Sequence, residues 1–377
     1  MAPRVALVHD FLLDLRGAER VFAAICDAWP EADVFTAVYD QQGTEGRFAA
    51  RAPRTSFLQH VRPTARTFRP LLPLYPRAIE SLDLRGYELV VSSSSAWAHG
   101  VIADPVAVHV CYCHNPFRYA WTEMDATVAA RPWPLRAPLA TVLTRWRQWD
   151  RAAARRVDRY VANSTLTASR VRDYFGREAH VLHPPVELNR FRPGEVGDHY
   201  LVVAELMAHK RIDVAVEAFN RLRMPLTVVG DGPAGRHLRR LAGPTVTFTG
   251  RLADREVADL MRSARALVVT AAEEFGIAAV EALASGRPVI ALASGGVQEV
   301  VRPGRTGVFF PRSNADSLAE AVTAFDPLAV DPRTCVSAAG RFAVPRFQHT
   351  FRGLVGDALA ARNGVAAAEP LPRAAAG

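Results

Sequence analysis

Two glutamates, Glu273 and Glu281, have the spacing that most strongly indicates chemistry, because seven residues separate them in a largely apolar stretch. The segment VVTAAEEFGIAAVEALASGRPVIAL predicts a buried strand over 268–270, a helix over 275–284 and a second strand from 288. Glu273 then lies in the loop before the helix, and Glu281 lies within the helix. A carboxylate on an apolar helix costs free energy unless it is hydrogen-bonded, so Glu281 is expected to accept a hydrogen bond.

The start of the predicted helix offers a place for a phosphate. Free N–H groups near Gly276 and Ile277 carry partial positive charge, and Gly276 leaves room for close approach. The alternative is an ordinary strand–helix–strand crossover in a parallel sheet, with one buried glutamate that hydrogen bonds satisfy.

This spacing resembles the E-x7-E motif of retaining nucleotide-sugar glycosyltransferases of family 4, which have the GT-B fold. The segment ALVVTAAEEFGIAAVEALASGRPVIALASGGVQEVV follows that family's pattern almost continuously, and the resemblance covers nearly all of the chain up to residue 360. It implies that the donor is bound by Glu273, Phe275, Gly276, Ile277 and Glu281. It also implies transfer with retention at the anomeric carbon. In the family the departing diphosphate is thought to help deprotonate the acceptor, so neither an enzymic nucleophile nor a metal is expected.

Lys210 is the single lysine of the chain, since arginine takes every other position among the 46 residues that are Lys or Arg. Its segment AELMAHKRID resembles the family loop SRLVPYKRID, in which an arginine and a lysine neutralise the donor diphosphate. Lys210 matches the lysine, Arg211 is a weaker candidate, and Glu205 stands at the arginine position. An acid would repel a diphosphate, so Glu205 is expected to point away, to pair with an arginine such as Arg211, or to mark an altered donor site. The alternative for Lys210 is a solvated surface residue.

His114 follows a predicted strand that begins at 108. Ligands bind beyond the carboxyl ends of parallel strands in open α/β sheets, although a lone histidine is more often a satisfied core residue. The segment VHVCYCHNPFRYAW resembles the YCHTPxRYxW of mannosyltransferase-like members of the family, with Asn115 in place of threonine. The resemblance implies that His114 lies beside the transferred sugar, and that Arg118 and Tyr119 lie near the acceptor.

Gly17 ends the loop after the first predicted strand, 5–8, and precedes a predicted helix over 18–28. The sequence RGAERV here resembles the family's GGAERV, in which glycine lets the loop approach the donor diphosphate. Arg16 replaces one glycine of that pair, so only Gly17 is expected to have this role.

Strands and helices alternate along the chain, which predicts an α/β protein. Together with the GT-B resemblance, this predicts two Rossmann-like domains whose parallel sheets face across a cleft. A polar, proline-containing linker near 190–198 separates them. We expect an acceptor domain over 1–192, a donor domain over 193–345, a return helix over 346–363 that packs toward the first domain, and a disordered tail over 364–377.

The formal net charge of +8 is concentrated in two aromatic-containing segments. Segment 51–86 has seven arginines and two acidic residues, and segment 131–159 has eight arginines and two acidic residues. Such segments bind an anionic membrane or nucleic acid, and no nucleic-acid-binding module is present. We therefore expect membrane docking, with Trp146 and Trp149 at headgroup depth. The alternative is a solvated basic face whose tryptophans pack inward.

Location and metal content follow from what the sequence lacks. It has neither a run of about 20 apolar residues nor a signal-peptide cleavage site, which favours the cytoplasm and a peripheral position on the inner face of the cytoplasmic membrane. The four cysteines offer only a C-x-C pair, so reduced thiols and no structural metal are expected. No DxD-like metal motif occurs in a suitable loop.

The favoured function is transfer of a hexose from a nucleotide sugar to a hydroxyl of a glycan. The expected acceptors are lipid-linked intermediates of cell-surface polysaccharide synthesis. GDP-mannose is the expected donor, solely because the HNPFRYAW and EEFGI segments resemble mannosyltransferase-type relatives, and a UDP-hexose is the alternative. No cofactor beyond this donor is expected. Two other functions stay open: a non-catalytic basic membrane-binding protein on the same scaffold, for which Glu205 is the main reason, and a GT-B epimerase or phosphorylase.

Overall fold

The computed structural model describes residues 3–65, 67–362 and 364. The chain divides into two compact units: unit 1 holds the residues up to Leu182 and those from Gln348 onward, and unit 2 runs from His183 to Phe347. The predicted boundary after residue 192 lies within unit 2. The tail predicted to be disordered, 364–377, lies outside the described residues except for Gly364.

Within the described part of unit 1, seven parallel strands form one sheet in the order β3-β2-β1-β4-β5-β6-β7. The central strands β4 and β5 are buried along their whole length, as expected for a parallel sheet covered on both faces. The strands are β1 (Val5–His9), β2 (Asp33–Thr36), β3 (Arg54–Thr55), β4 (Leu89–Ser94), β5 (Val108–Cys113), β6 (Arg159–Ala162) and β7 (Ala179–Val181).

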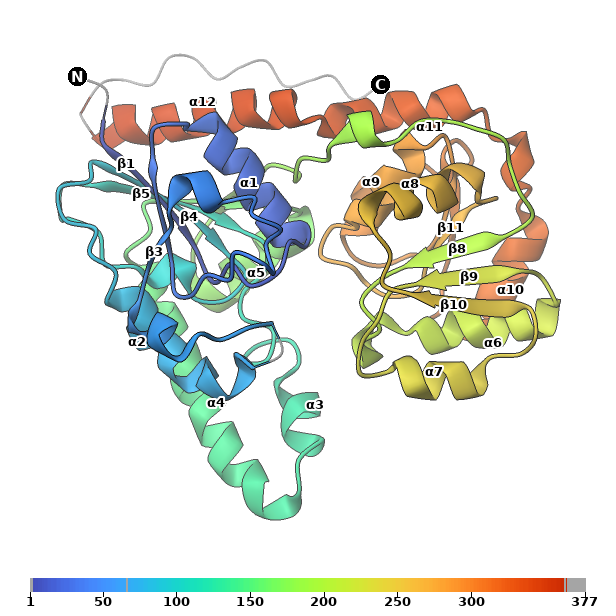
Figure 1. Ribbon diagram of the computed structural model, residues 1–377, viewed down its shortest axis with the longest axis horizontal. Coiled ribbons are helices and arrows are strands. Elements are labelled where there is room, and N and C mark those ends of the chain that lie inside the picture. The colour runs from blue at the N-terminus through green and yellow to red at the C-terminus, as the bar shows by residue number, and fades with distance from the viewer. Residues whose placement is uncertain (1–2, 66, 363, 365–377) are drawn as a thin grey trace. The chain divides into compact units, whose positions relative to one another are not determined.

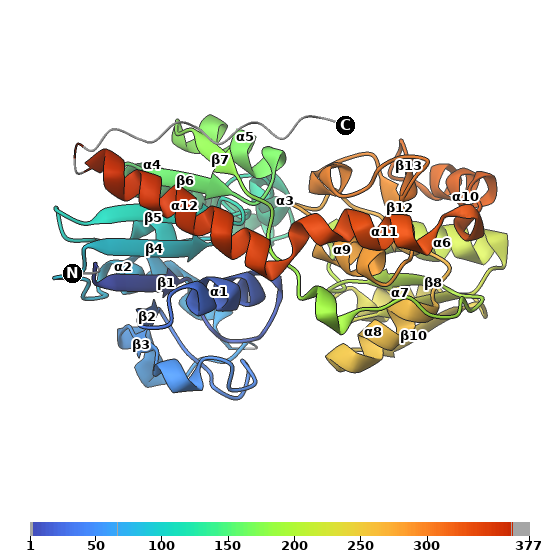
Figure 2. The same cartoon turned by 90° about the horizontal axis from the view of Figure 1, so that it is seen from above.

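The helices of unit 1 cover both faces of its sheet, with α12 and α4 on opposite sides (Figure 1). They are α1 (Gly17–Ala28), α2 (Tyr75–Glu80), α3 (Met124–Ala129), α4 (Trp133–Ala154), α5 (Thr165–Phe175) and the greater part of α12 (Val344–Arg362). Figure 2 shows α12 beside α1, where Gln348 donates to the carbonyl of Ala24 at 2.8 Å and Phe351 packs edge-on against Trp29. The last helix therefore completes unit 1.

The tryptophans of α4 do not all face solvent. Trp146 packs against Trp97 and Phe117 in the core of unit 1, and Trp149 donates from Nε1 to Glu80 at 3.0 Å. The expectation that Trp146 and Trp149 lie at headgroup depth is therefore wrong, because both side chains pack inward. Trp133, at the start of α4, is instead 82% exposed.

In unit 2, six parallel strands among the described residues form a sheet in the order β10-β9-β8-β11-β12-β13. They are β8 (Tyr200–Val203), β9 (Leu226–Val229), β10 (Val246–Gly250), β11 (Leu267–Val269), β12 (Val289–Leu292) and β13 (Gly307–Phe310). Helices α6 (Ile212–Leu222), α7 (Gly235–Leu241) and α10 (Ala315–Ala324) lie on one face, and α8 (Asp254–Ser263), α9 (Ile277–Ala284) and α11 (Pro332–Ala339) lie on the other (Figure 1). The prediction of two Rossmann-like domains with parallel sheets is confirmed.

Three further findings concern the cysteines, the membrane and the metal. All four cysteines are buried and unpaired. Among the described residues, no helix has the length and apolar character needed to cross a bilayer. Over the same residues, no cluster of three or more His, Cys, Asp or Glu side chains has a metal-binding arrangement.

Candidate functional site

Each sheet reverses its strand order at one point, between β1 and β4 in unit 1 and between β8 and β11 in unit 2. In open α/β sheets, ligands bind beyond the carboxyl ends of the strands at such a point. The predicted residues gather there in each unit: Lys210 follows β8, Glu273 follows β11, and His114 directly follows β5, the neighbour of β4. The strand topology therefore gives each unit its own candidate site.

In unit 1, a chain of buried polar side chains crosses the carboxyl ends of β1, β4 and β5. Glu19 lies 3.7 Å from Nε2 of His9, whose Nδ1 lies 3.1 Å from the hydroxyl of Ser93. The same hydroxyl lies 2.9 Å from Nε2 of His114. All four side chains are buried. His114 is thus connected through Ser93 and His9 to a carboxylate.

The protonation of His114 can be assigned from these partners. Burial, and secondarily the nearby His9, lower its pKa to about 3, so the imidazole is neutral at physiological pH. The Glu19 carboxylate favours a proton on the nitrogen of His9 that faces it, which leaves the other nitrogen to accept from Ser93. The Ser93 oxygen then accepts from Nε2–H of His114. Nδ1 of His114 is left as a hydrogen-bond acceptor, which suits a sugar hydroxyl.

Asp10 organises the loop after β4. Its carboxylate accepts from the backbone N–H groups of Ser95, Ala96, Trp97 and Ala98 at 2.5 to 3.1 Å, and its side chain is buried. These four backbone donors satisfy the hydrogen-bonding capacity of the buried carboxylate. Asp10 thereby fixes the backbone next to Ser93.

The residues expected near the acceptor lie just beyond His114. Arg118 forms an ion pair with Glu123 at 3.5 Å, and each side chain is about a quarter exposed. The ring of Tyr119 packs edge-on against Phe117. Asn115, which departs from the family pattern, accepts from Arg170 at 2.7 Å. Arg118 and Tyr119 are thus held close to His114 in the sequence and remain partly accessible.

Gly17 is the first residue of α1, and Arg16 is the N-cap. The guanidinium of Arg16 donates to Asp14 at 2.8 Å, and its backbone N–H donates to Glu19 at 3.1 Å. Arg16 therefore helps to hold Glu19 at the far end of the chain that leads to His114. Sequence comparison alone suggested only the loss of a glycine at this position.

In unit 2, Lys210 and Glu273 contact one another directly. Nζ of Lys210 donates to Oε2 of Glu273 at 2.5 Å, and each side chain is only about one fifth exposed. Thr270, directly after β11, donates to the carbonyl of Lys210 at 2.8 Å. The two charged residues therefore come from loops that are also joined through the backbone.

Arg211 and Glu205, the other two charged residues considered in this loop, do not pair with one another. Arg211 directs its guanidinium to Asp213, with contacts from 3.1 to 3.3 Å, and so does not serve as the partner of Glu205. Glu205 is exposed, as expected if it points away from a diphosphate. Of the two basic candidates, Lys210 is the one that faces the motif glutamate.

The helix predicted over 275–284 begins two residues later, at Ile277. Gly276 has a φ of +96°, which lies outside the helical region and which residues with a side chain rarely adopt. Phe275 is buried in the core of unit 2 against His183 and Phe342, so only its backbone is available to a ligand. Glu281 lies within α9 and is partly buried.

The backbone of Glu273 is packed closely by the glycine pair after β12. The N–H of Gly296 donates to the carbonyl of Glu273 at 2.8 Å, and Gly295 pairs with Glu273 in an isolated bridge. A Cβ at Gly295 would lie 2.4 Å from that carbonyl oxygen, and one at Gly296 would lie 2.2 Å from the carbonyl oxygen of Glu274. Only glycines permit this approach, which fixes the loop that carries Glu273.

Comparison with known proteins gives matches over both halves of the chain. Residues 15–190 match the model described as Glycosyltransferase Family 4, and residues 197–325 match the model described as Glycosyl transferases group 1. A D-inositol 3-phosphate glycosyltransferase of Mycobacterium tuberculosis (strain ATCC 25618 / H37Rv) is 31% identical over 203 residues, which cover 47% of this chain and 42% of that relative. The match thus spans less than half the length of that relative.

Solved structures resemble nearly the whole chain. Anabaena Alr3699/HepE in complex with UDP and glucose has a TM-score of 0.67 at 17% identity, covering 93% of this chain and 99% of the other. Sucrose-phosphate synthase from Thermosynechococcus elongatus has a TM-score of 0.71 at 18% identity, covering 95% and 100%. These similarities confirm the predicted GT-B fold, and the two family matches support the resemblance to family 4.

Proposed function

We propose that this chain, whose two halves match glycosyltransferase models, is a retaining, metal-independent hexosyltransferase that uses a nucleotide sugar as donor. The observation that carries the proposal is the pairing of Lys210 with Glu273 at the strand-order reversal of unit 2. This reversal is where an open α/β sheet binds a ligand, and a lysine there suits a diphosphate.

In this proposal, unit 2 binds the donor. Lys210 and the N–H groups that follow Gly276 stabilise the negative charge that develops on the departing diphosphate. The carboxylates of Glu273 and Glu281 accept hydrogen bonds from sugar and ribose hydroxyls. Because the diphosphate replaces Glu273 as the partner of Lys210, donor binding frees that carboxylate to hold the sugar.

Unit 1 serves the acceptor. The neutral His114 accepts, through Nδ1, a hydrogen bond from a hydroxyl of the transferred sugar. Arg118 and Tyr119 bind the acceptor beyond it. No side chain is required as a nucleophile, because the leaving diphosphate takes the acceptor proton on the same face of the sugar. Positioning and electrostatic stabilisation then account for the catalysis.

GDP-mannose is the donor that the mannosyltransferase-like segments favour, and a UDP-hexose is the second candidate. The latter is supported by one solved neighbour, Anabaena Alr3699/HepE, which is described in complexes with UDP and glucose and with UDP-glucose. The acceptor is proposed to be a glycan, in lipid-linked form, used for cell-surface polysaccharide. A non-catalytic membrane-binding scaffold is the remaining alternative.

One experiment tests the class and the donor together. The full chain is incubated with GDP-mannose, UDP-glucose or UDP-N-acetylglucosamine and a lipid-linked acceptor mixture, and donor consumption and the anomeric configuration of the product are measured by NMR. We expect consumption of one donor with retention. Lys210→Ala, assayed in parallel, should lose this activity. If neither GDP nor UDP binds in isothermal titration, the scaffold alternative replaces the enzyme.

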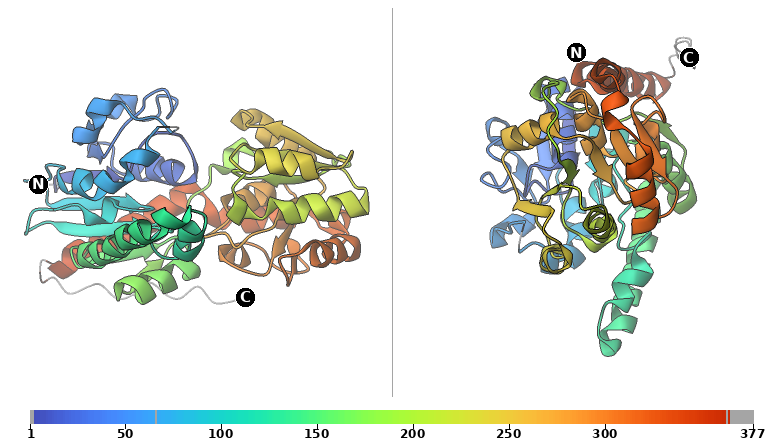
Figure 3. Two further views of the ribbon diagram at one scale, coloured as in Figure 1. Left: turned by 90° about the horizontal axis from the view of Figure 1, so that it is seen from below. Right: turned by 90° about the vertical axis from the view of Figure 1, so that its right-hand side faces the viewer.

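We also propose a peripheral position on the cytoplasmic face of the membrane. The support is the tip of the hairpin formed by α3 and the start of α4, which projects from the rest of unit 1 (Figure 3). It exposes Trp133 and Leu135 between Arg131 and Arg136, and no acidic residue occurs over 126–149. This combination of exposed apolar and basic side chains suits an anionic lipid surface.

A further inference from the structure

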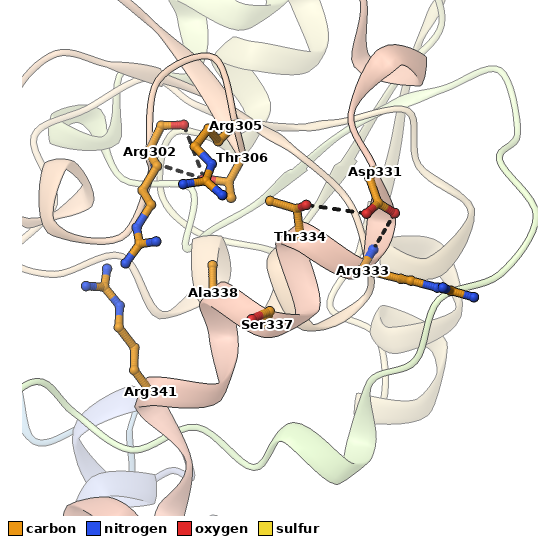
Figure 4. Close-up of a pocket in the computed structure, with 9 residues that line it drawn as sticks. All are labelled: Arg302, Arg305, Thr306, Asp331, Arg333, Thr334, Ser337, Ala338 and Arg341. Carbon is orange, nitrogen blue, oxygen red and sulfur yellow. Dashed lines mark hydrogen bonds between the residues drawn. The ribbon is translucent and has the colours of Figure 1, made fainter. Parts of the chain in front are cut away.

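Unit 2 has a basic cavity that none of the donor-side residues lines. Its volume is about 360 Å³, and Lys210, Glu273 and Gly276 are absent from its wall. The lining residues are Arg302, Arg305, Thr306, Asp331, Arg333, Thr334, Ser337, Ala338 and Arg341 (Figure 4). Four arginines thus face one aspartate, which gives the wall a positive charge.

The single acid of this wall is already engaged. Asp331 is the N-cap of α11, where it accepts from the backbone N–H of Arg333 at 2.9 Å and from the hydroxyl of Thr334 at 3.4 Å. No ion pair joins it to any of the four arginines in the part of the chain that the structure describes. The positive charge is therefore not neutralised from within the cavity.

Two guanidinium groups are turned toward one another. Figure 4 shows the side chains of Arg302 and Arg341 extending from opposite walls with their guanidinium groups facing. Burial and the neighbouring charge of Arg302 lower the pKa of Arg341. Like charges held in this way repel, and a multivalent anion placed between them would replace repulsion with attraction.

The side chain of Arg341 is held in the wall by the backbone and still has an N–H group without a partner. Its guanidinium donates to the carbonyls of Glu299 and Val300 and lies over the ring of Phe342. Its Nε–H is buried and has no hydrogen-bond partner. Across the cavity, the guanidinium of Arg302 has neither a hydrogen bond nor an ion pair among the described residues, while its backbone is fixed by hydrogen bonds to Thr306.

We propose that this cavity is a second anion site, which binds a small soluble phosphate anion such as pyrophosphate or an organic phosphate, with Arg302 and Arg341 as its principal ligands. Guanidinium groups are suited to phosphate because they donate in a planar fork. Ala338 is the single apolar residue among those that line the cavity, so a lipid tail would meet few apolar side chains there. The volume is in the range of small-ligand sites.

The proposal is tested by isothermal titration of the full chain with inorganic pyrophosphate. Arg302→Ala should weaken binding about tenfold or more, because it removes the charge-assisted hydrogen bonds that Arg302 would donate to the anion. The fold should be unaffected, because Arg302 is exposed and its guanidinium forms no hydrogen bond or ion pair with the rest of the described chain. The matched control is Arg333→Ala, which removes the same charge from the same wall. The side chain of Arg333 points away from the facing pair in Figure 4, so its loss should change the affinity no more than about twofold.

The same titration in a donor-site variant distinguishes binding at this cavity from binding at the donor site. Pyrophosphate also resembles the donor diphosphate, so the titration is repeated with Lys210→Ala, in which binding at the cavity should persist. Loss of binding in Lys210→Ala together with unchanged binding in Arg302→Ala would overturn the proposal. Equal weakening by Arg302→Ala and Arg333→Ala would also overturn it, because the anion would then be responding only to overall charge.

Discussion

Lys210 and Glu273 form an ion pair in which Nζ lies 2.5 Å from Oε2, and this pair joins the loops that follow β8 and β11. The single lysine of the chain and the first glutamate of the E-x7-E motif are therefore partners. Because a diphosphate carries more charge than one carboxylate, we expect donor binding to exchange the partner of Lys210.

Lys210→Ala should lower the turnover rate about 100-fold or more, because it removes one preorganised donor from the charge that develops on the leaving group. Glu273→Gln keeps the shape of its side chain but removes the competing negative charge. We expect it to lower turnover while leaving the affinity for the nucleoside diphosphate unchanged or tighter. Steady-state rates and titration with the diphosphate measure both effects, and unchanged turnover in Lys210→Ala would remove Lys210 from the site.

Glu205→Arg restores the arginine of the family pattern and tests whether the acid affects the donor site. Glu205 is exposed, and Arg211 binds Asp213 instead of Glu205. We therefore expect turnover and donor affinity to stay within about twofold of the original values, since exposed charges interact weakly through water. A large gain in activity would instead show that Glu205 repels the diphosphate.

Gly276→Ala should destabilise the start of α9 by about 1–2 kcal/mol, because a φ of +96° is strained for a residue with a side chain. The added Cβ would meet nothing closer than 3.6 Å, so the strain comes from the backbone alone. If the N–H groups after Gly276 hold the diphosphate, donor affinity should also fall, which titration measures.

The matched control is Gly304→Ala in the same unit. Gly304 has a φ of +74°, and an added Cβ would find open space. The Gly304→Ala variant should lose a similar amount of stability, measured by chemical unfolding, and should retain its affinity for the donor. Equal loss of affinity in both variants would mean that the effect of Gly276→Ala reflects stability only.

The fold was predictable because its signals are local. Apolar runs of four to six residues alternate with helical segments, so the strand predicted over 5–8 is β1 (Val5–His9) and the strand predicted from 288 is β12 (Val289–Leu292), each within one residue of its predicted bounds. The start of α9 was not predicted correctly, because a glycine before an Ala-rich segment reads as part of the helix until its positive φ is known. The inward packing of Trp146 was only the alternative interpretation, since the direction in which an aromatic side chain points depends on the rest of the core.

The candidate site was predictable only in part. Lys210 was selected as the single lysine, Glu273 by its spacing from Glu281, and His114 by its position after a predicted strand within a family-like segment. Their partners, however, are distant in the sequence. Sequence reasoning assigned no role to His9 and left the serines at 92–95 open between capping a helix and lining a cleft. Ser93 meets His114 only because β4 and β5 are neighbours in register.

Unit 1 should become less stable as the pH falls below about 6.5, because two buried histidines stay neutral in the fold. The pKa values of His109 and His114 are lowered to about 3, mainly by burial. The unfolded chain binds protons at these histidines below its ordinary pKa, whereas the folded chain does not. Their contribution to stability is therefore complete above pH 6.5 and is lost as the pH falls toward 3, by about 1.4 kcal/mol per pH unit for each histidine.

Tryptophan fluorescence measures this loss in the full chain, since all six tryptophans lie within residues 1–182. Urea unfolding curves at pH 7.0, 6.0 and 5.0 should shift steadily to lower urea concentration. His109→Gln provides the test, because Nδ1 of His109 has no hydrogen-bond partner and the residue lies away from His114 along β5. It should reduce the pH dependence by about half, and an unchanged dependence would show that these histidines do not titrate on unfolding.

The tip formed by α3 and the start of α4 should bind anionic membranes. Trp133 is 82% exposed and Leu135 is 55% exposed, and neither position contributes to the core of unit 1. Burial of a leucine or tryptophan in the headgroup region is favourable by about 1.5–3 kcal/mol, and each nearby arginine adds about 1 kcal/mol on an anionic leaflet. Binding should therefore need both anionic lipid and the two apolar side chains, and should weaken with salt because its electrostatic part is screened.

Co-sedimentation with vesicles of phosphatidylglycerol and phosphatidylcholine, and with vesicles of phosphatidylcholine alone, measures this binding at low and high salt. We expect Trp133→Ala and Leu135→Ala each to lower the affinity for anionic vesicles about tenfold. Leu328→Ala is the matched control, because Leu328 is also 55% exposed but belongs to unit 2. If the protein sediments equally poorly with both kinds of vesicle at low salt, the membrane position is wrong and the acceptor must be sought among soluble glycans. If Leu328→Ala weakens binding as much as Leu135→Ala does, the tip is not the contact.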